Sequence, residues 1–387
     1  MQDRAGQWLL VSVLLIAVLG IASADTMPER VLVAREGNGY LERVGPQLVL
    51  HLKGSPAEMG RQHGTLLRTE IASLIAAIEA HGEKALGPMA DSSFDLVWNM
   101  QLKHVPDRYV EEMKALSEAA GIPYEKIRRC NTIPEFFHCS GFALFGEATR
   151  GGVICHGRIL DYAVGMGLQD HSGVVIASPE GLEPFVNVTY AGFIGSVTGM
   201  NGSGIGFGEI GGKGLGKWDG IPMAFLMRRG LEECKSLDAA RALFEQSKRT
   251  CEYYYVISDA NKPGALGVHA TDSTIDFIGP NEAKGPLNMP IKDAVVISEG
   301  DRYPVLVQRI KEDYGRLDAA RCRELMRRPV SMKKCLHTVL MAPGLGRLWV
   351  AHATSDGQPA SEQEYVFLDV AELMSSEPQG RDKPARQ

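Results

Sequence analysis

The sequence predicts an α+β fold in which antiparallel sheets lie between helical layers. Residues 25–138 look mostly helical, because apolar side chains recur at helical spacing, as in Leu66–Ile78. From Cys139 to about Ile210 the pattern changes to short apolar and β-branched runs separated by glycine-rich turns, which is typical of strands in hairpins. Helix-like and strand-like blocks then alternate along the chain. This alternation predicts stacked layers of sheet and helix.

Local signals bound the elements of the first part. A strand is expected at Leu48–Leu52. A helix should begin after Ser55, because Ser55 can cap its N-terminus, Pro56 suits the first helical position and Glu58 completes a capping box. Another helix is expected over Pro106–Ala120.

The same reasoning gives the elements of the second part. The expected strands are Phe142–Phe145, Val153–His156, Gly173–Ala177, Phe185–Tyr190, Ile194–Thr198, Ile205–Phe207, Tyr253–Ser258, Ala265–Ala270, Ala294–Ser298, Leu336–Met341, Leu348–His352 and Tyr365–Val370. The expected helices are Ile221–Glu233, Leu237–Ser247, Tyr303–Tyr314 and Asp318–Arg327.

Composition limits the classes of function. The chain has 387 residues, of which 44% are hydrophobic and 23% charged, and its formal net charge is -6. It has no basic stripe interleaved with aromatic residues, so we do not expect a nucleic-acid partner. Its seven cysteines form no C-x-x-C pair and no ligand-like cluster, which disfavours a zinc site. We expect no metal or organic cofactor, while one or two disulfides remain possible.

The first residues predict an export signal. Arg4 precedes the apolar run Trp8–Ala22, and Ala22-Ser23-Ala24 offers an A-x-A cleavage site. The run is shorter than the roughly 20 residues that a membrane-spanning helix needs, although a retained N-terminal anchor stays open. We therefore expect residues 1–24 to be a signal peptide and the protein to be exported, either to a periplasm or out of the cell.

One predicted hairpin carries the candidate chemistry. Cys139 opens its first strand, and Arg158 and Asp161 follow 19 and 22 positions later, at the far end of the second strand. Antiparallel pairing brings that end back beside Cys139. A guanidinium there would favour a thiolate, and a carboxylate could orient an amine. A chain that began at Cys139 would also have an α-amino group, a base with a pKa of about 7.7–8.0.

This hairpin resembles the nucleophile hairpin of the penicillin acyltransferase-like N-terminal nucleophile hydrolases, peptidase family C45. It is similar, more distantly, to that of bile salt (choloylglycine) hydrolases and penicillin V acylases. The resemblance extends over about residues 48–370 and implies a four-layer αββα sandwich. Four blocks in the same order carry it: Leu52–Gly64, His138–Tyr162, Gly192–Ile205, and Leu336–Leu340 with Trp349–Ala351.

The resemblance also implies a mechanism. The chain would cleave itself between His138 and Cys139 by an N-to-S acyl shift, and the α piece (25–138) and the β piece (139–387) would stay associated. Cys139 would then be the nucleophile, its α-amino group the base, and the guanidinium and carboxylate of the hairpin their supports. The implied activity is hydrolysis or transfer of an acyl group from a small N-acyl amide or other acyl donor, through a thioester.

One side chain of the related hydrolases is missing from this chain. Related bile salt hydrolases place an oxyanion-donating asparagine on a strand that aligns with Val295–Glu299, and this chain has no asparagine there. We expect backbone N–H groups near Ile210 and Gly211 to act instead. Trp218 and His337 are expected to contact the substrate.

Two other functions stay open at this point. The first is a conventional cysteine peptidase, in which an internal Cys139 pairs with a distant His337 or His352. The second is an inactive, secreted relative that keeps the fold for binding or for a structural role.

Overall fold

The computed structural model describes residues 25–132, 139–162, 164–212 and 216–378. The predicted signal peptide and His138 therefore lie outside the described residues. Within them, no helix is long and apolar enough to cross a membrane. All seven cysteines are described, and no disulfide joins any of them.

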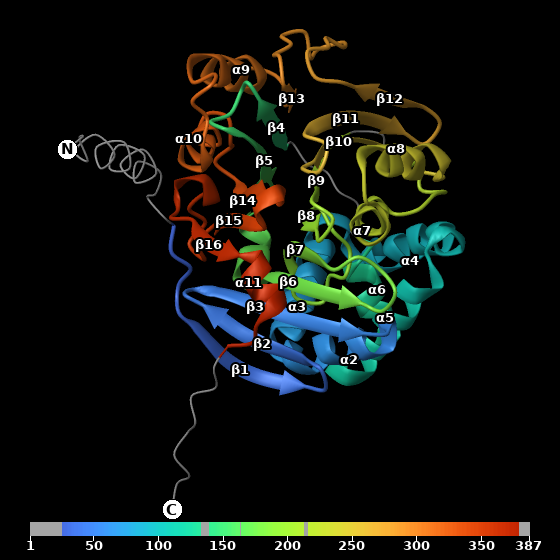
Figure 1. Cartoon of the computed structure of the whole chain (residues 1–387). Coiled ribbons are helices and arrows are strands. Elements are labelled where there is room, and N and C mark those ends of the chain that lie inside the picture. The colour runs from blue at the N-terminus through green and yellow to red at the C-terminus, as the bar shows by residue number, and fades with distance from the viewer. Residues whose placement is uncertain (1–24, 133–138, 163, 213–215, 379–387) are drawn as a thin grey trace, which may run out of the picture.

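Two sheets form the core (Figure 1). The first has the order β1 (Arg30–Glu36), β2 (Gly39–Val44), β3 (Gln47–Gly54), β6 (Ser172–Pro179), β7 (Phe185–Tyr190), β8 (Thr198–Asn201), β9 (Ile205–Ile210), β10 (Glu252–Asp259), β11 (Gly264–Thr271) and β12 (Ile275–Ile278). The second has the order β13 (Ala294–Ile297), β4 (Ser140–Gly146), β5 (Gly152–Asp161), β14 (Cys335–Ala342), β15 (Arg347–His352) and β16 (Val366–Asp369).

The two sheets pack face to face, with β9 and β10 of the first against β4 and β5 of the second. Buried side chains such as Phe142 and Phe207 fill the space between them. On the outer side of the first sheet lie α7 (Met223–Glu233) and α8 (Leu237–Gln246), while α9 (Arg302–Glu312) and α10 (Ala319–Leu325) pack on the second. The predicted α+β class, with two sheets and covering helices, is confirmed.

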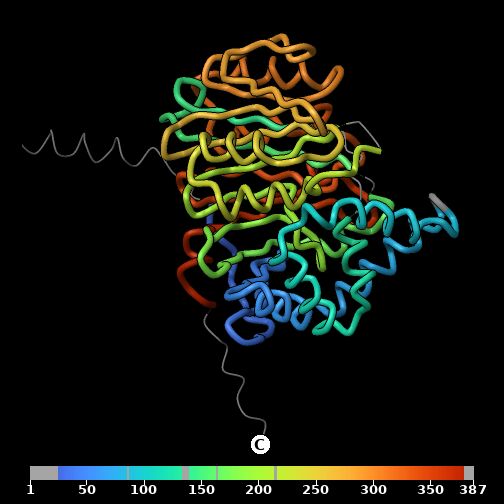
Figure 2. Tube along the Cα trace, turned by 90° about the vertical axis from the view of Figure 1, so that its right-hand side faces the viewer, coloured from blue at the N-terminus to red at the C-terminus, as the bar shows by residue number. Residues whose placement is uncertain are grey.

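The helices of the first part lie with β1–β3 toward the end of the molecule opposite α9 and β12 (Figure 2). Ser55 and Glu58 form the predicted capping box at the start of the first of them. A Cβ at Gly60 would come within 2.2 Å of the Glu112 carbonyl oxygen, so glycine allows two of these helices to touch. The helices are α2 (Pro56–Leu66), α3 (Arg68–Leu86), α4 (Ala90–Gln101), α5 (Asp107–Ala120) and α6 (Tyr124–Cys130).

The structure departs from the sequence prediction in several places. Strands β1, β2 and β12 were not predicted, and β3 pairs with β6 in parallel, so the sheets are not wholly antiparallel. The strand expected at Ile194–Thr198 begins only at Thr198. The remaining short helices are α11 (Val370–Ser375) and the 3₁₀ turns Gly87–Met89, Leu102–His104, Val164–Met166, Leu168–His171, Pro343–Leu345 and Ala360–Glu362.

Candidate active site

The predicted hairpin is formed by β4 and β5. Cys139 stands directly before β4, and Ser140 and Gly141 pair with Ile159 and Arg158 of β5. Asp161 is the last residue of β5 and faces β14 in the register of the second sheet. The register therefore brings the far end of β5 back to Cys139, as the sequence predicts.

Arg158 lies against the thiol and is fully buried. Its guanidinium is close enough to Cys139 to lower the pKa of the thiol, and its Nη2 donates to Glu209 Oε2 at 3.0 Å. Gly208 on β9 leaves room for it, because a Cβ there would stand 3.3 Å from Arg158 Cδ. Glu209 was not among the predicted residues. Burial raises the pKa of Glu209 to about 7, although Arg158 opposes the shift.

Asp161 is held from two sides. Its carboxylate accepts hydrogen bonds from the Met332 backbone N–H and from Arg302 Nη1, both at 2.8 Å. Arg302 also donates to the Cys139 carbonyl oxygen at 3.4 Å. Burial raises the pKa of Asp161 to about 6, and the Met332 N–H, Arg302 and Arg158 oppose this.

Arg302 was missed by the sequence reasoning, although the sequence gives one signal for it. It is the first residue of α9, where the positive end of the helix dipole disfavours a cation. A basic residue at that position needs a compensating partner. Asp161 supplies it.

The Cys139 side chain reaches a cavity. Cys139 is only 2% exposed, but it lines a cavity of about 430 Å³. Burial raises the pKa of the Cys139 thiol to about 12, Arg158 lowers it, and Glu209 and Asp161 raise it further. The thiol is therefore protonated at neutral pH in the uncut chain, and a reaction needs a proton acceptor beside it. The rest of the wall is formed by Ile210, Gly211, Gly212, Glu252, Tyr254, Pro286, Leu287, Ile297, Ser298, Glu299, Gly300 and Tyr303.

Two predicted oxyanion positions lie on this wall. Ile210 ends β9 and Gly211 follows it, so both predicted positions line the same cavity as Cys139, while the role of their N–H groups stays a prediction. On the strand where no asparagine was found, Ser298 lies directly after β13 and also lines the cavity. Its hydroxyl is 2.7 Å from that of Ser140.

Trp218 and His337 are not in this wall. Trp218 is half-buried and packs on the core. The His337 ring is buried, and its two nitrogens meet the hydroxyls of Tyr190 at 3.2 Å and Thr198 at 3.1 Å. Burial lowers the pKa of His337 well below its usual value. A role for either residue in substrate contact stays a prediction.

The histidines of the peptidase alternative are not placed to act on Cys139 through this cavity. His352 contacts Gln47 at 3.0 Å, and burial lowers its pKa to about 4. Neither His352 nor His337 lines the wall. In the part of the chain that the structure describes, no group of His, Cys, Asp and Glu is arranged to hold a metal ion.

No protein-family model matches the chain. Among curated proteins it is similar to protein dcd1B of Dictyostelium discoideum, with 23% identity over 90% of this chain and 80% of that protein. It is 26% identical to dcd1A of the same organism, over 58% of this chain and 59% of that protein. It is also 27% identical to the acid ceramidase of Macaca fascicularis, over 40% of this chain and 45% of that protein.

Among the solved structures that it resembles are an amidase, an acylase and a bile acid hydrolase. An N-acylethanolamine-hydrolyzing acid amidase ortholog from Caenorhabditis elegans has a TM-score of 0.44 at 20% identity, covering 54% of this chain and 94% of that one. Penicillin V acylase from Agrobacterium tumefaciens has a TM-score of 0.39 at 10% identity, covering 56% and 83%. A conjugated bile acid hydrolase from Clostridium perfringens has a TM-score of 0.37 at 12% identity, covering 59% and 96%. The resemblance expected from the motifs is confirmed: the chain is similar to proteins of the N-terminal nucleophile hydrolase family.

Proposed function

We propose that the chain is a self-processing cysteine amidohydrolase or acyltransferase that acts on a small N-acyl amide or related acyl donor. One observation carries the proposal: the β4–β5 register places Cys139 beside Arg158 and Asp161, and Cys139 lines a cavity of about 430 Å³. Support comes from the relatives, which include an acid amidase, a penicillin V acylase and a bile acid hydrolase. In the proposed fold, the two sheets and their outer helices form the four αββα layers.

The first step is processing. The Cys139 sulfur attacks the carbonyl carbon of His138, the peptide C–N bond breaks, and the nitrogen takes the thiol proton. Water then hydrolyses the resulting thioester. This gives a carboxylate on His138, a thiol on Cys139 and a new α-amino group on the same residue. The products are the α piece (25–138) and the β piece (139–387).

The new amine supplies what the buried thiol lacks. Because burial holds the thiol pKa at about 12, the sulfur needs a base to take its proton, and an α-amino group has a pKa of about 7.7–8.0. Arg158 then stabilises the thiolate. Asp161, which is paired with Arg302, orients the new α-amino group. The proton passes only between groups of the chain and the substrate, so the route requires no cofactor.

The turnover proceeds through a thioester. The thiolate attacks the amide carbon, and backbone N–H groups near Ile210 and Gly211 stabilise the oxyanion of the tetrahedral intermediate. The ammonium of Cys139 gives its proton to the leaving nitrogen, so that the C–N bond breaks and the amine departs. Water, or an acceptor amine in the transferase case, then attacks the thioester. Its proton returns to the α-amino group.

The test is fragment analysis of the purified chain. We expect two bands on a denaturing gel, split near residue 138, and a β piece whose N-terminal sequence begins at Cys139. Cys139→Ala should stay one chain and be inactive, and a screen of N-acyl amides, amino-acid conjugates, β-lactams and acyl-CoA donors should find turnover only in the processed protein. An intact chain that turns over substrate at the full rate would contradict the proposal.

A further inference from the structure

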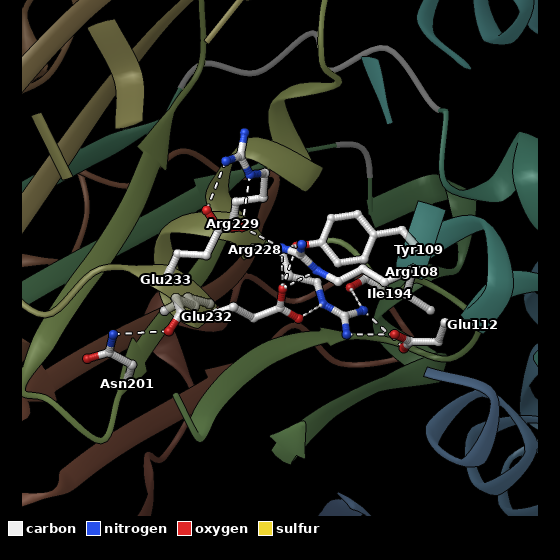
Figure 3. Close-up of polar contacts among 10 residues, drawn as sticks. Arg108, Tyr109, Glu112, Ile194, Asn201, Arg228, Arg229, Glu232 and Glu233 are labelled. Carbon is white, nitrogen blue, oxygen red and sulfur yellow. Dashed lines mark hydrogen bonds and ion pairs between the residues drawn. The ribbon is translucent and has the colours of Figure 1, made fainter. Parts of the chain in front are cut away.

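A buried group of charged side chains joins α5 to α7, away from the cavity (Figure 3). We call it the α5–α7 charge cluster. Helix α5 belongs to residues 25–138 and α7 to residues 139–387, so every contact between them crosses the proposed cut. The members are Arg108, Tyr109 and Glu112 on α5, and Arg228, Arg229, Glu232 and Glu233 on α7.

Arg228 is the centre of this cluster. Its guanidinium donates to both Glu112 oxygens, at 2.9 and 2.6 Å, and to Glu232 at 2.8 Å. The side chains of Arg228, Glu112 and Glu232 are only 3%, 2% and 1% exposed. Burying three charges is unfavourable unless each is paired and hydrogen-bonded, and here all three are. The cluster is therefore stable only as a complete set.

Glu232 connects the rest of the cluster. Its Oε2 accepts from the Tyr109 hydroxyl at 2.7 Å and from Arg108 at 3.0 Å. The cluster residues of each helix are neutral in sum, with Arg108 and Glu112 on α5 and two arginines and two glutamates on α7. The ion pairs of Glu112 with Arg228 and of Arg108 with Glu232, however, form only when both helices are present. Separating the helices would leave Glu112 without its cation.

The same contacts reach the loop that leads from Tyr190 to β8. Arg228 donates to the Ile194 carbonyl oxygen at 2.9 Å. Asn131, which follows α6 in the α piece, accepts from the Ile194 N–H at 2.8 Å and donates to the Gly192 carbonyl oxygen at 2.9 Å. His63 accepts from the Gly192 N–H at 3.0 Å. The α piece and α7 therefore both bind this loop.

We infer that the α5–α7 charge cluster is the docking surface that keeps the α piece bound to the β piece after cleavage. Its partner is the chain's own residues 25–138, and the inference rests on the proposed processing. The parallel β3–β6 pairing also crosses the cut, but it depends on main-chain groups. A change of side-chain charge therefore tests the cluster alone.

The experiment compares Glu112→Gln with Glu233→Gln in the processed protein. Both remove one negative charge at constant shape, but Glu112 is 2% exposed and Glu233 is 27% exposed. Size-exclusion chromatography over a dilution series measures the dissociation of the two fragments. We expect Glu112→Gln to weaken association by about thirtyfold or more, and Glu233→Gln by less than about fivefold.

Activity gives a second readout of the same equilibrium. The specific activity of Glu112→Gln should fall on dilution and recover on concentration, whereas that of the wild type should stay constant. Equal dissociation of Glu112→Gln and wild type, or equal weakening by both variants, would overturn the inference. If Glu112→Gln does not fold, Tyr109→Phe replaces it. It removes only the hydroxyl that donates to Glu232, and we expect association about tenfold weaker.

The experiments distinguish a failure of the docking inference from a failure of the proposed cleavage. A single band for the wild type on a denaturing gel would contradict the cleavage. The cluster would then be tested in the intact chain by urea unfolding. There, Glu112→Gln should lower the midpoint and Glu233→Gln should leave it nearly unchanged. Equal midpoints would overturn the role of the cluster whether or not the chain is cut.

Discussion

Two groups of buried charged side chains in this chain differ in how many of their polar atoms are hydrogen-bonded. In the α5–α7 charge cluster, each guanidinium nitrogen of Arg228 donates to a glutamate or a carbonyl oxygen. At the reaction centre, Arg158 Nε and Glu209 Oε1 are buried without a hydrogen-bond partner in the described structure. Proteins rarely leave such atoms unpaired, and those that remain are concentrated at functional sites.

The electrostatic consequence follows the same division. At the reaction centre, burial raises the pKa of Asp161 to about 6 and that of Glu209 to about 7, so both carboxyls titrate close to physiological pH. Such groups can exchange protons during a reaction. The cluster instead holds Arg228 between Glu112 and Glu232 as a fixed ion pair network. The difference supports the proposals that the group around Arg158 serves chemistry and that the α5–α7 charge cluster serves association.

The largest expected effect comes from Arg158→Gln. Removing the cation takes away the thiolate's support and leaves Glu209 buried without its partner. We expect kcat/KM to fall about 10²–10³-fold or more, by the scale of losing one electrostatic contact in a reaction centre. The rate of Cys139 alkylation by iodoacetamide, followed against pH, should show a higher thiol pKa. Wild-type alkylation kinetics in this variant would remove Arg158 from the mechanism.

The second test exchanges neighbouring arginines on α7. Arg228 is 3% exposed and Arg229 is 28% exposed, and each pairs with the glutamate four residues later. Arg228→Met leaves Glu112 and Glu232 buried with fewer donors, so we expect a loss of about 3–5 kcal/mol in the free energy of unfolding. Arg229→Met should lose less than about 1 kcal/mol. Urea unfolding measures both, and similar losses would show that burial does not separate the two pairs.

The third test concerns pH. Because burial raises the pKa of Asp161 to about 6, the carboxylate becomes protonated as the pH falls through that value. The neutral acid no longer attracts the Arg302 cation, so kcat/KM should fall more steeply below about pH 6, after a first fall that begins where the α-amino base is protonated, at about pH 7.7–8.0. A pH–rate profile of the processed wild type measures this limb. Asp161→Asn should have low activity, and its profile should lack this acid limb. An unchanged limb in that variant would assign the limb to another group, and Glu209 is the next candidate.

The sequence predicted those parts of the site that depend on local pairing. The β4–β5 hairpin follows from two neighbouring runs, so the positions of Cys139, Arg158 and Asp161 could be derived from one turn. Glu209 and Arg302 could not be found in this way. Glu209 reaches Arg158 only because β9 packs across the sheet interface, and Arg302 reaches Asp161 only because α9 starts beside β5.

The same limit explains the errors in the fold. The parallel pairing of Val49 with Val174 joins segments far apart in sequence, and no local pattern specifies it. The setting of His337, whose contact with a substrate stays a prediction, also depends on non-local packing. In the structure, its ring nitrogens are hydrogen-bonded to the hydroxyls of Tyr190 and Thr198. This arrangement depends on three strands from two sheets.

The smallest expected effect comes from Gly208→Ala, which changes the space around Arg158 without removing a charge. A Cβ at this position would stand 3.0 Å from His156 Nε2 and 3.3 Å from Arg158 Cδ, so both side chains must move by a few tenths of an ångström. We expect the free energy of unfolding to fall by about 1 kcal/mol, the lower end of overpacking costs, and the alkylation of Cys139 to become slower. Gly60→Ala is the matched change beside the cluster, where the Cβ would meet backbone instead. It should destabilise the chain more than Gly208→Ala and leave the alkylation rate of Cys139 unchanged; equal alkylation rates in the two variants would show that Arg158 is not tightly held.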